Sequence, residues 1–154
     1  MRLSSNWILA PATLGVGYSP VAPGTLGTLL ALPFAYWLQA LSVPVQTMLI
    51  VLAIPACIAV CHQAEKLLQQ TDSSKIVLDE FIAMLACCIA LPTGWQWLFL
   101  SFVLFRLLDI LKPWPISWVE RNLKGGAGVV SDDLMAAGIC WLAIQITAHL
   151  TAGL

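Results

Sequence analysis

Charged side chains are scarce in this sequence: only 10% of its 154 residues are Asp, Glu, Lys or Arg, whereas 60% are hydrophobic. A soluble domain averages about 25% charged residues, so a fold of this composition could not cover its surface in water. The scarcity excludes an ordinary soluble domain and predicts a protein that is integral to the membrane. Because the length suits one compact domain, we expect residues 1–154 to form a single membrane-embedded unit.

Further absences exclude several classes of function. The formal net charge at pH 7 is −1, so no electrostatic field points to nucleic acid as a partner. The stretch Gly15–Thr28 is rich in glycine but lacks the lysine of a P-loop, which argues against nucleotide binding. No Ser/His/Asp or Cys/His arrangement surrounds His62 or His149, so a nucleophilic triad is not indicated.

The five cysteines all lie inside apolar runs, which is typical of small buried residues. Cys57 and Cys61 are four residues apart and His62 follows directly, so a soft-metal site is an alternative. It is the weaker interpretation, because no second pair of ligands has zinc spacing.

Apolar runs separated by polar stretches predict the architecture, an all-α bundle of about four to five apolar segments in the membrane. The expected segments are Leu26–Leu41, Val45–Cys61, Phe81–Leu91, Trp95–Leu108 and Leu134–Leu154. Pro55 is expected to bend the second of them. Phe81–Leu91 is short for a span, and residues 7–16 are interrupted by Pro11 and Gly15, so full crossing stays open for both.

The distribution of charge predicts the orientation of the bundle. The tight turns at 42–44 and 92–94 carry no charge, and if each pair of apolar segments is a hairpin, both turns face one side. All seven basic residues then lie on the other side, which the positive-inside rule makes cytoplasmic. These residues are Arg2, Lys66, Lys75, Arg106, Lys112, Arg121 and Lys124.

The acidic side chains gather on that same face, in or beside the stretches 64–80, 106–113 and 120–133. They are Glu65, Asp72, Asp79, Glu80, Asp109, Glu120, Asp132 and Asp133. A carboxylate near hydrocarbon costs about 2.5–3.5 kcal/mol on insertion scales, so such a cluster indicates a functional site. Hard carboxylate oxygens at a membrane face suit Mg²⁺ and, through it, a phosphate.

Two of the acidic motifs stand at the edges of apolar segments. Asp79 and Glu80 precede Phe81, where one can bind a metal while the other orients a water; simple capping of a helix N-terminus is the alternative. Arg106, Asp109 and Lys112 recur every three residues and would share a helical face. Asp109 would bind metal while Arg106 or Lys112 binds phosphate oxygens; a self-neutralising Arg106–Asp109 ion pair is the alternative.

Two glycine-containing stretches complete the candidate site. Gly125–Gly128 precedes Asp132 and Asp133, and such a loop before a helix allows close approach of the backbone to an anion. The alternative is a flexible linker with Asp132 as the N-cap. In the N-terminal loop, backbone N–H groups can line a headgroup pocket, and Thr25 or Thr28 can cap the first span.

Together these stretches resemble the phosphatidylglycerophosphatase A family. The matching segments are Ser19–Leu29 (SPVAPGTLGTL), Val77–Glu80 (VLDE), Phe105–Ile116 (FRLLDILKPWPI) and Gly125–Asp133 (GGAGVVSDD). The resemblance covers nearly the whole chain, with the motifs in the family's order. It implies an all-helical, Mg²⁺-dependent lipid phosphatase of the bacterial plasma (inner) membrane. Such an enzyme converts phosphatidylglycerophosphate in the bilayer to phosphatidylglycerol.

With that resemblance, the candidate residues take roles. The expected Mg²⁺ ligands are Asp79, Glu80, Asp109, Asp132 and Asp133. The expected catalytic groups are Glu80, Asp109 and Asp133, with Glu80 or Asp133 as base toward the attacking water. The expected phosphate and substrate contacts are Arg106, Lys112, Gly24, Thr25, Gly126 and Gly128. One metal or two, water attack or an aspartyl-phosphate intermediate, the direct ligands and the oligomeric state all stay open.

Other classes of membrane protein share part of this pattern. A CDP-alcohol phosphotransferase would need a D-G-x-x-A-R helix motif that the sequence lacks. A small transporter or an ion-binding membrane protein would also explain buried Arg106 and Asp109. Transporters usually place such charges near the midplane between repeats, whereas no repeat is evident here and the charges collect at one face.

Overall fold

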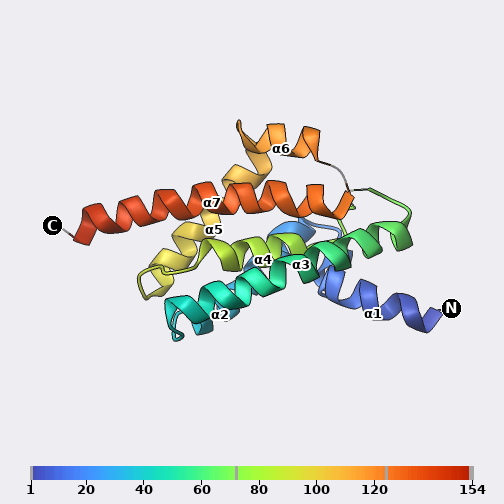
Figure 1. Cartoon of the computed structure of the whole chain (residues 1–154), viewed down its shortest axis with the longest axis horizontal. Helices are drawn as coiled ribbons and strands as arrows, with labels where there is room; N and C mark the ends of the chain where they lie inside the picture. The colour runs from blue at the N-terminus through green and yellow to red at the C-terminus, as the bar shows by residue number, and fades with distance from the viewer. Residues whose placement is uncertain (1, 72, 124, 153–154) are drawn as a thin grey trace.

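The computed structural model describes residues 2–71, 73–123 and 125–152, and within these ranges the chain contains helices and no β-strand (Figure 1). The expected all-α fold is therefore confirmed. Asp72 and Lys124 lie outside the described residues, as does the end of the expected segment Leu134–Leu154. The elements are α1 (Arg2–Thr13), the 3₁₀ turn η1 (Val16–Tyr18), α2 (Pro23–Leu38), α3 (Val43–Leu68), α4 (Leu78–Cys87), α5 (Trp95–Leu111), α6 (Ile116–Asn122) and α7 (Gly125–Ala152).

Two of these helices, α3 and α7, are longer than the segments expected from the apolar runs. α3 continues through Cys61 to Leu68, because the residues that follow Cys61 are mostly good helix formers, and the next residue, Gln69, caps the helix with a φ of 52°. α7 already begins at Gly125. Of the helices in the described ranges, α3 and the part of α7 over Gly125–Thr151 are long and apolar enough to cross a membrane, which suggests membrane association. The expected four to five segments stay a prediction.

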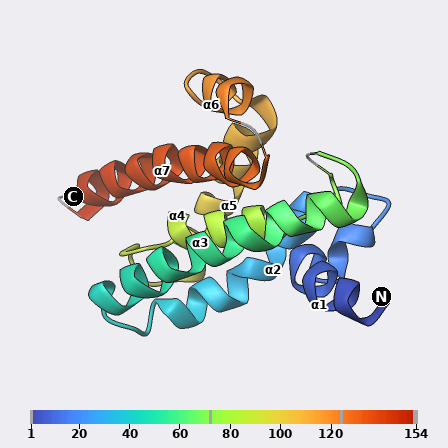
Figure 2. The ribbon, with the colours of Figure 1, turned by 45° about the vertical axis from the view of Figure 1, so that its right-hand side comes forward.

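The short helix α4 lies at the centre of the bundle, where it packs against α2, α3, α5 and α7. Its residues Ile82, Ala83, Met84 and Leu85 are buried. α3 and α7 run along the molecule on either side of α4 in Figure 1, and Figure 2 shows α2 beneath α3. The third apolar run thus forms a core helix that its neighbours enclose.

The uncharged turns meet at one end of the bundle. Gln39, after α2, donates a hydrogen bond from Nε2 to the carbonyl of Pro92 at 3.2 Å. The rings of Tyr36 and Trp95 stack with a centroid separation of 4.8 Å. The N-terminus of α7 and the loop before α4 lie toward the opposite end, which Figure 1 shows at the right. There the Val77 N–H donates to the carbonyl of Ala12. The charged loops and the uncharged turns are therefore separated along the bundle.

The glycine loop expected at Gly125–Asp133 is wrong, because the whole segment forms the first turns of α7. A Cβ atom on Gly126 would lie 2.6 Å from the Cβ of His62, and one on Gly128 would lie 2.6 Å from the Leu123 carbonyl oxygen. The glycines let α7 approach α3 and the end of α6 closely. The alternative with Asp132 as an N-cap is also wrong, since Asp132 lies well inside the helix.

All five cysteines are buried, as the sequence predicts, and all are free thiols. Cys57 and Cys61 place their sulfur atoms 3.8 Å apart on α3. His62, next to them, is exposed. In the described part of the chain no group of three His, Cys, Asp or Glu side chains is arranged to hold a metal ion, so the soft-metal alternative gains no support.

Candidate functional site

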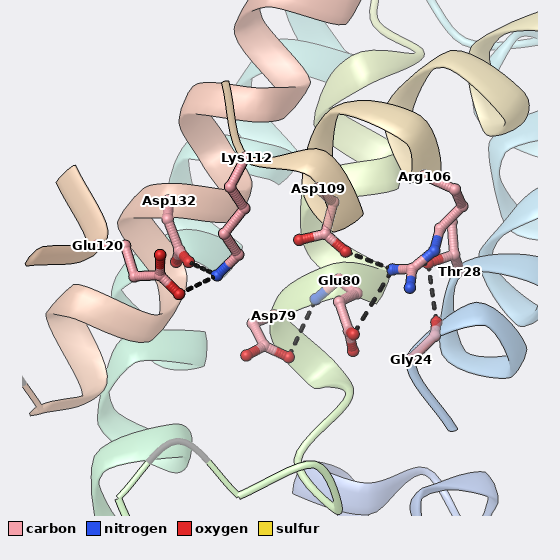
Figure 3. A network of polar contacts seen from close by, with 9 residues as sticks. All are labelled: Gly24, Thr28, Asp79, Glu80, Arg106, Asp109, Lys112, Glu120 and Asp132. Atoms are coloured by element: carbon pink, nitrogen blue, oxygen red, sulfur yellow. Dashed lines mark hydrogen bonds and ion pairs between the residues drawn. The ribbon is translucent and has the colours of Figure 1, made fainter. Parts of the chain in front are cut away.

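Charged side chains from α4, α5, α6 and α7 meet near the C-terminal end of α5 (Figure 3). α4 contributes Asp79 and Glu80 from its first turn, and α5 contributes Arg106 and Asp109 from its last turns. Three motifs that are far apart in the sequence therefore come together in space. The clustering follows from α4 packing against α2, α5 and α7.

Arg106 is the centre of the first group. Its Nη1 atom lies 2.6 Å from Asp109 Oδ2 and 3.6 Å from Glu80 Oε1, and the three side chains are only 12–17% exposed. The same nitrogen donates to the hydroxyl of Thr28 on α2 at 3.5 Å. The Arg106–Asp109 ion pair expected as an alternative is present. It does not stand alone, however, because Glu80 from another helix shares the guanidinium.

α2 contributes two residues, Thr28 and Gly24, that contact this group. The Thr28 hydroxyl donates to the Gly24 carbonyl at 2.9 Å, which holds its oxygen toward Arg106. Thr28 therefore does not cap the helix, whose first turn has no side-chain cap. A Cβ atom on Gly24 would collide with the Glu80 carboxylate. Gly24 thus adjoins the cluster through its contact with Glu80, and Thr25 follows it in the first turn of α2. The expected contact of Gly24 and Thr25 with phosphate stays a prediction.

Lys112 forms the second group. α5 ends at Leu111 and Lys112 turns away with a φ of 42°, so the expected helical face shared with Arg106 and Asp109 does not extend to it. Its Nζ atom donates to Glu120 Oε1 at 2.6 Å and to Asp132 Oδ2 at 2.7 Å. Burial alone would lower the pKa of Lys112. The hydrogen bonds and charges of Asp132 and Glu120 outweigh burial and raise that pKa, so the ammonium stays charged.

Carboxylates outnumber cations between the two groups. Asp79 and Asp133 are each about 5% exposed and form none of the ion pairs with Arg106 or Lys112. The negative charges that act on Asp133 are those of Asp79, Asp109, Glu80 and Asp132. Burial, and then the charge of Glu80, raise the pKa of Asp79 well above its usual value. The site therefore holds more carboxyl groups than Arg106 and Lys112 pair with, and burial together with this crowding favours the protonated form of Asp79.

The donor chemistry of this site fits Mg²⁺, although its present geometry is not that of a coordination sphere. Its donors are hard carboxylate oxygens, and Asp132 Oδ1 is buried with no hydrogen-bond partner among the described residues. In those residues no three acidic side chains converge closely enough to hold a metal ion. Asp109 and Asp132 instead face Arg106 and Lys112.

The structure brings most of the expected site residues together and separates two. Asp79, Glu80, Arg106 and Asp109 contact or adjoin one another, as do Lys112 and Asp132. Gly126 instead packs on α3, and Gly128 packs on Leu123.

The sequence interpretation missed Thr28 and Glu120 as partners of Arg106 and Lys112. A threonine four residues after Gly24 in an apolar helix was the available signal for the first. The only sequence signal for Glu120 was its position in an acidic stretch.

The fold and the site define a helical protein with a polar cluster near one end of its apolar core, and two of its helices are apolar enough to suggest membrane association. The family model for phosphatidylglycerophosphatase A matches residues 9–148, and the chain belongs to this family of phosphatases. It is 42% identical to phosphatidylglycerophosphatase A of Escherichia coli (strain K12), over 90% of this chain and 81% of the relative. It is 35% identical to the Haemophilus influenzae protein of the same name, over 80% and 77% of the two chains.

A third relative carries another description. A Bacteroides thetaiotaomicron protein, described as a candidate phosphatidylinositol-3-phosphatase, is 34% identical over 90% of this chain and 91% of its own length. No solved structure matches the chain. The family is thus established by sequence, and the geometry of the site comes from this structure.

Proposed function

We propose that this protein removes the terminal phosphate of phosphatidylglycerophosphate in a bacterial inner membrane, yielding phosphatidylglycerol and phosphate. The observation that carries the proposal is the convergence of Glu80 on α4 with Arg106 and Asp109 on α5, in a chain 42% identical to a phosphatidylglycerophosphatase A. The match to a family of phosphatases favours this activity over the alternative of a transporter.

Arg106 and Lys112 are the groups that bind the phosphate. The Nε atom of Arg106 is buried and has no hydrogen-bond partner in the described ranges, so it can donate to a non-bridging oxygen. Asp109, Glu80 and Thr28 fix the guanidinium so that little reorganisation is needed when the phosphate arrives. Lys112 supplies a second positive charge, held by Asp132 and Glu120.

Mg²⁺ is the proposed cofactor, and its support is the surplus of buried carboxylates. The residues that would hold it are Asp79, Glu80, Asp109, Asp132 and Asp133. When bound, the ion supplies Lewis-acid polarisation of the phosphoryl group and lowers the pKa of a bound water. Asp79 and Asp133 are best suited as ligands, because neither is engaged by Arg106 or Lys112.

The proposed reaction is hydrolysis of a phosphate monoester. The oxygen of water forms a bond to phosphorus, the bond from phosphorus to the glycerol oxygen breaks, and that oxygen leaves as an alcohol by receiving the proton that the base has taken from water. Glu80 or Asp133 takes the proton from water. Asp109 acts by keeping Arg106 in place. The acyl chains stay in the bilayer and the site faces the cytoplasm, as the positive-inside rule favours.

Phosphate release from phosphatidylglycerophosphate in detergent micelles tests the proposal, with Mg²⁺ and with excess chelator, for wild type and Asp109→Asn. Release that requires Mg²⁺ and drops in the variant is expected. Phosphatidylinositol 3-phosphate serves as the comparison substrate, because one relative carries that description. No release from folded protein would refute the activity, and faster release from the inositol lipid would refute the substrate.

A further inference from the structure

An apolar crevice of about 270 Å³ opens between α3 and α7, over the C-terminal end of the short helix α4 that lies between them (Figure 1). Its lining includes six residues from these helices and the turn after α4: Thr47, Ala86, Ile89, Leu134, Ala137 and Trp141. Thr47 and Trp141 are exposed and form the mouth, whereas Ala137 is buried. The proposed reaction uses none of these residues.

The polar groups of this lining are already engaged within the protein. The Thr47 hydroxyl donates to the carbonyl of Val43 at 3.0 Å. The Trp141 indole N–H donates to the carbonyl of Ile89 at 2.8 Å. None of the residues that line the crevice is charged. A polar ligand would therefore lose its hydrogen bonds to water without replacing them, which is costly, so the crevice fits an apolar ligand.

The crevice begins at the height of the charged cluster. Leu134 follows Asp133 on α7, whereas Trp141 lies two turns further on, about 10 Å along the helix axis. Trp141 contacts the turn after α4, at the end of the bundle that carries the uncharged turns. A second apolar depression of about 470 Å³ shares Leu134 and continues to Ser131, next to Asp132. The apolar surface thus leads away from the cluster toward the uncharged turns.

The size and the surroundings of the crevice favour an acyl chain as the ligand. α3 and the part of α7 over Gly125–Thr151 are apolar enough to cross a membrane, so the mouth between them opens toward hydrocarbon. A helix of a second copy is about 10–12 Å wide with its side chains, and one turn of it would occupy more than about 270 Å³. A hydrocarbon chain is narrow, and it can enter from the side without leaving the bilayer.

We propose that this crevice holds one acyl chain of the lipid substrate while the headgroup lies at the charged cluster. The inference rests on the proposed function, in which Arg106 and Lys112 bind the terminal phosphate. A chain that passes from the bilayer to an apolar protein surface gains little from the hydrophobic effect, so the crevice acts through packing and orientation. It fixes the lipid relative to the site and thereby aligns the phosphate for attack.

Filling the crevice tests this role. Thr47→Trp places a large ring at the mouth. It should lower kcat/KM for phosphatidylglycerophosphate in mixed micelles with Mg²⁺ by about tenfold or more, since a misplacement of about 1 Å can cost roughly 100-fold. The deacylated, water-soluble headgroup carries the same terminal phosphate, and its kcat/KM should stay at the wild-type value. A variant that only disturbed the fold would lower both.

Thr147→Trp is the matched control. Thr147 is also an exposed threonine of a long apolar helix, and its hydroxyl donates to the carbonyl four residues earlier at 2.9 Å, as that of Thr47 does at 3.0 Å. It lies on α7 beyond Trp141, outside the crevice. The control should keep the wild-type kcat/KM for both substrates. An equal loss for the lipid in the two variants would overturn the role of the crevice.

A photoreactive lipid provides a measurement that does not need turnover. A phosphonate analogue of phosphatidylglycerophosphate with a diazirine in one acyl chain should label peptides that contain Thr47, Ile89 and Trp141, and the unlabelled phosphonate should compete. If phosphatidylcholine with the same chain labels equally and the phosphonate does not displace it, bilayer lipid in general fills the crevice and the inference is wrong.

The kinetic outcomes separate the inference from the proposed function. Full kcat/KM for the lipid in Thr47→Trp would overturn the inference and leave the phosphatase activity in place. If folded wild type releases phosphate from neither substrate, the proposed function fails, and the labelling result distinguishes that failure from failure of the crevice to hold the chain.

Discussion

Gly24 on α2 lies so close to the carboxylate of Glu80 on α4 that a Cβ atom would collide with it. The contact places Glu80 beside Arg106, whose Nη1 atom is 3.6 Å from Glu80 Oε1. A glycine in a helix normally weakens it by about 0.5–1 kcal/mol relative to alanine. Here the missing side chain makes room for a functional group, which explains a glycine within an apolar helix.

Gly24→Ala should therefore reduce activity more than stability. The methyl group would push Glu80 away from Arg106, and a misplacement of about 1 Å can cost roughly 100-fold in rate. Phosphate release and thermal unfolding in micelles measure the two effects. Gly138→Ala is the matched control, because a Cβ there meets nothing within 4 Å and should leave activity unchanged. Full activity in Gly24→Ala would show that the position of Glu80 does not matter.

Arg106→Ala should destabilise the fold as well as abolish activity. Its ion pair with Asp109 is mostly buried, and removing one partner of such a pair typically costs about 3–5 kcal/mol. The double variant Arg106→Leu with Asp109→Leu should recover part of that stability without recovering activity. Denaturant unfolding measures this, with Arg121→Ala on the exposed surface of α6 as the control expected within about 0.5 kcal/mol. Equal stability of Arg106→Ala and wild type would mean that the pair contributes nothing.

Mg²⁺ should raise the melting temperature of the protein even without substrate. A ligand that binds only the folded state stabilises it by about 2.7 kcal/mol at 100 times its Kd. Asp133→Asn should lose most of this effect, because it removes a buried carboxylate at the centre of the acidic group. Glu120→Gln, at a half-exposed side chain bonded to Lys112, should keep it. An unchanged Mg²⁺ effect in Asp133→Asn would exclude this residue as a ligand.

The two ends of the bundle should react with a membrane-impermeant thiol reagent from opposite sides of the membrane. Ser42 and Ser74 are both exposed, one in an uncharged turn and the other in a polar loop, whereas Ser73 is buried and unsuitable. The native cysteines are buried, so background labelling should be low. Ser42→Cys should label in intact cells and Ser74→Cys only in inverted vesicles. Labelling of both from the same side would refute the assigned orientation.

The motifs predicted which charged residues lie together better than they predicted the boundaries of the helices. Charge beside an apolar run is costly in free energy and usually serves a function. This made four residues recognisable: Asp79, Glu80, Arg106 and Asp109. The glycine stretch was misinterpreted because glycine permits a loop and close helix packing equally well. The start of α7 at Gly125 and the contacts of Gly126 with His62 and of Gly128 with Leu123 distinguish the two.

The sequence by itself determined that the chain is apolar, helical and charged in only a few stretches, since composition and periodicity act locally. The tertiary structure decided which of those charges meet. Lys112 follows the end of α5 and donates to Asp132 on α7. Glu80 lies beside Arg106 because Gly24 has no side chain in the space that the Glu80 carboxylate occupies. Such contacts join residues far apart in the chain, so they depend on how whole helices pack, which no local pattern specifies.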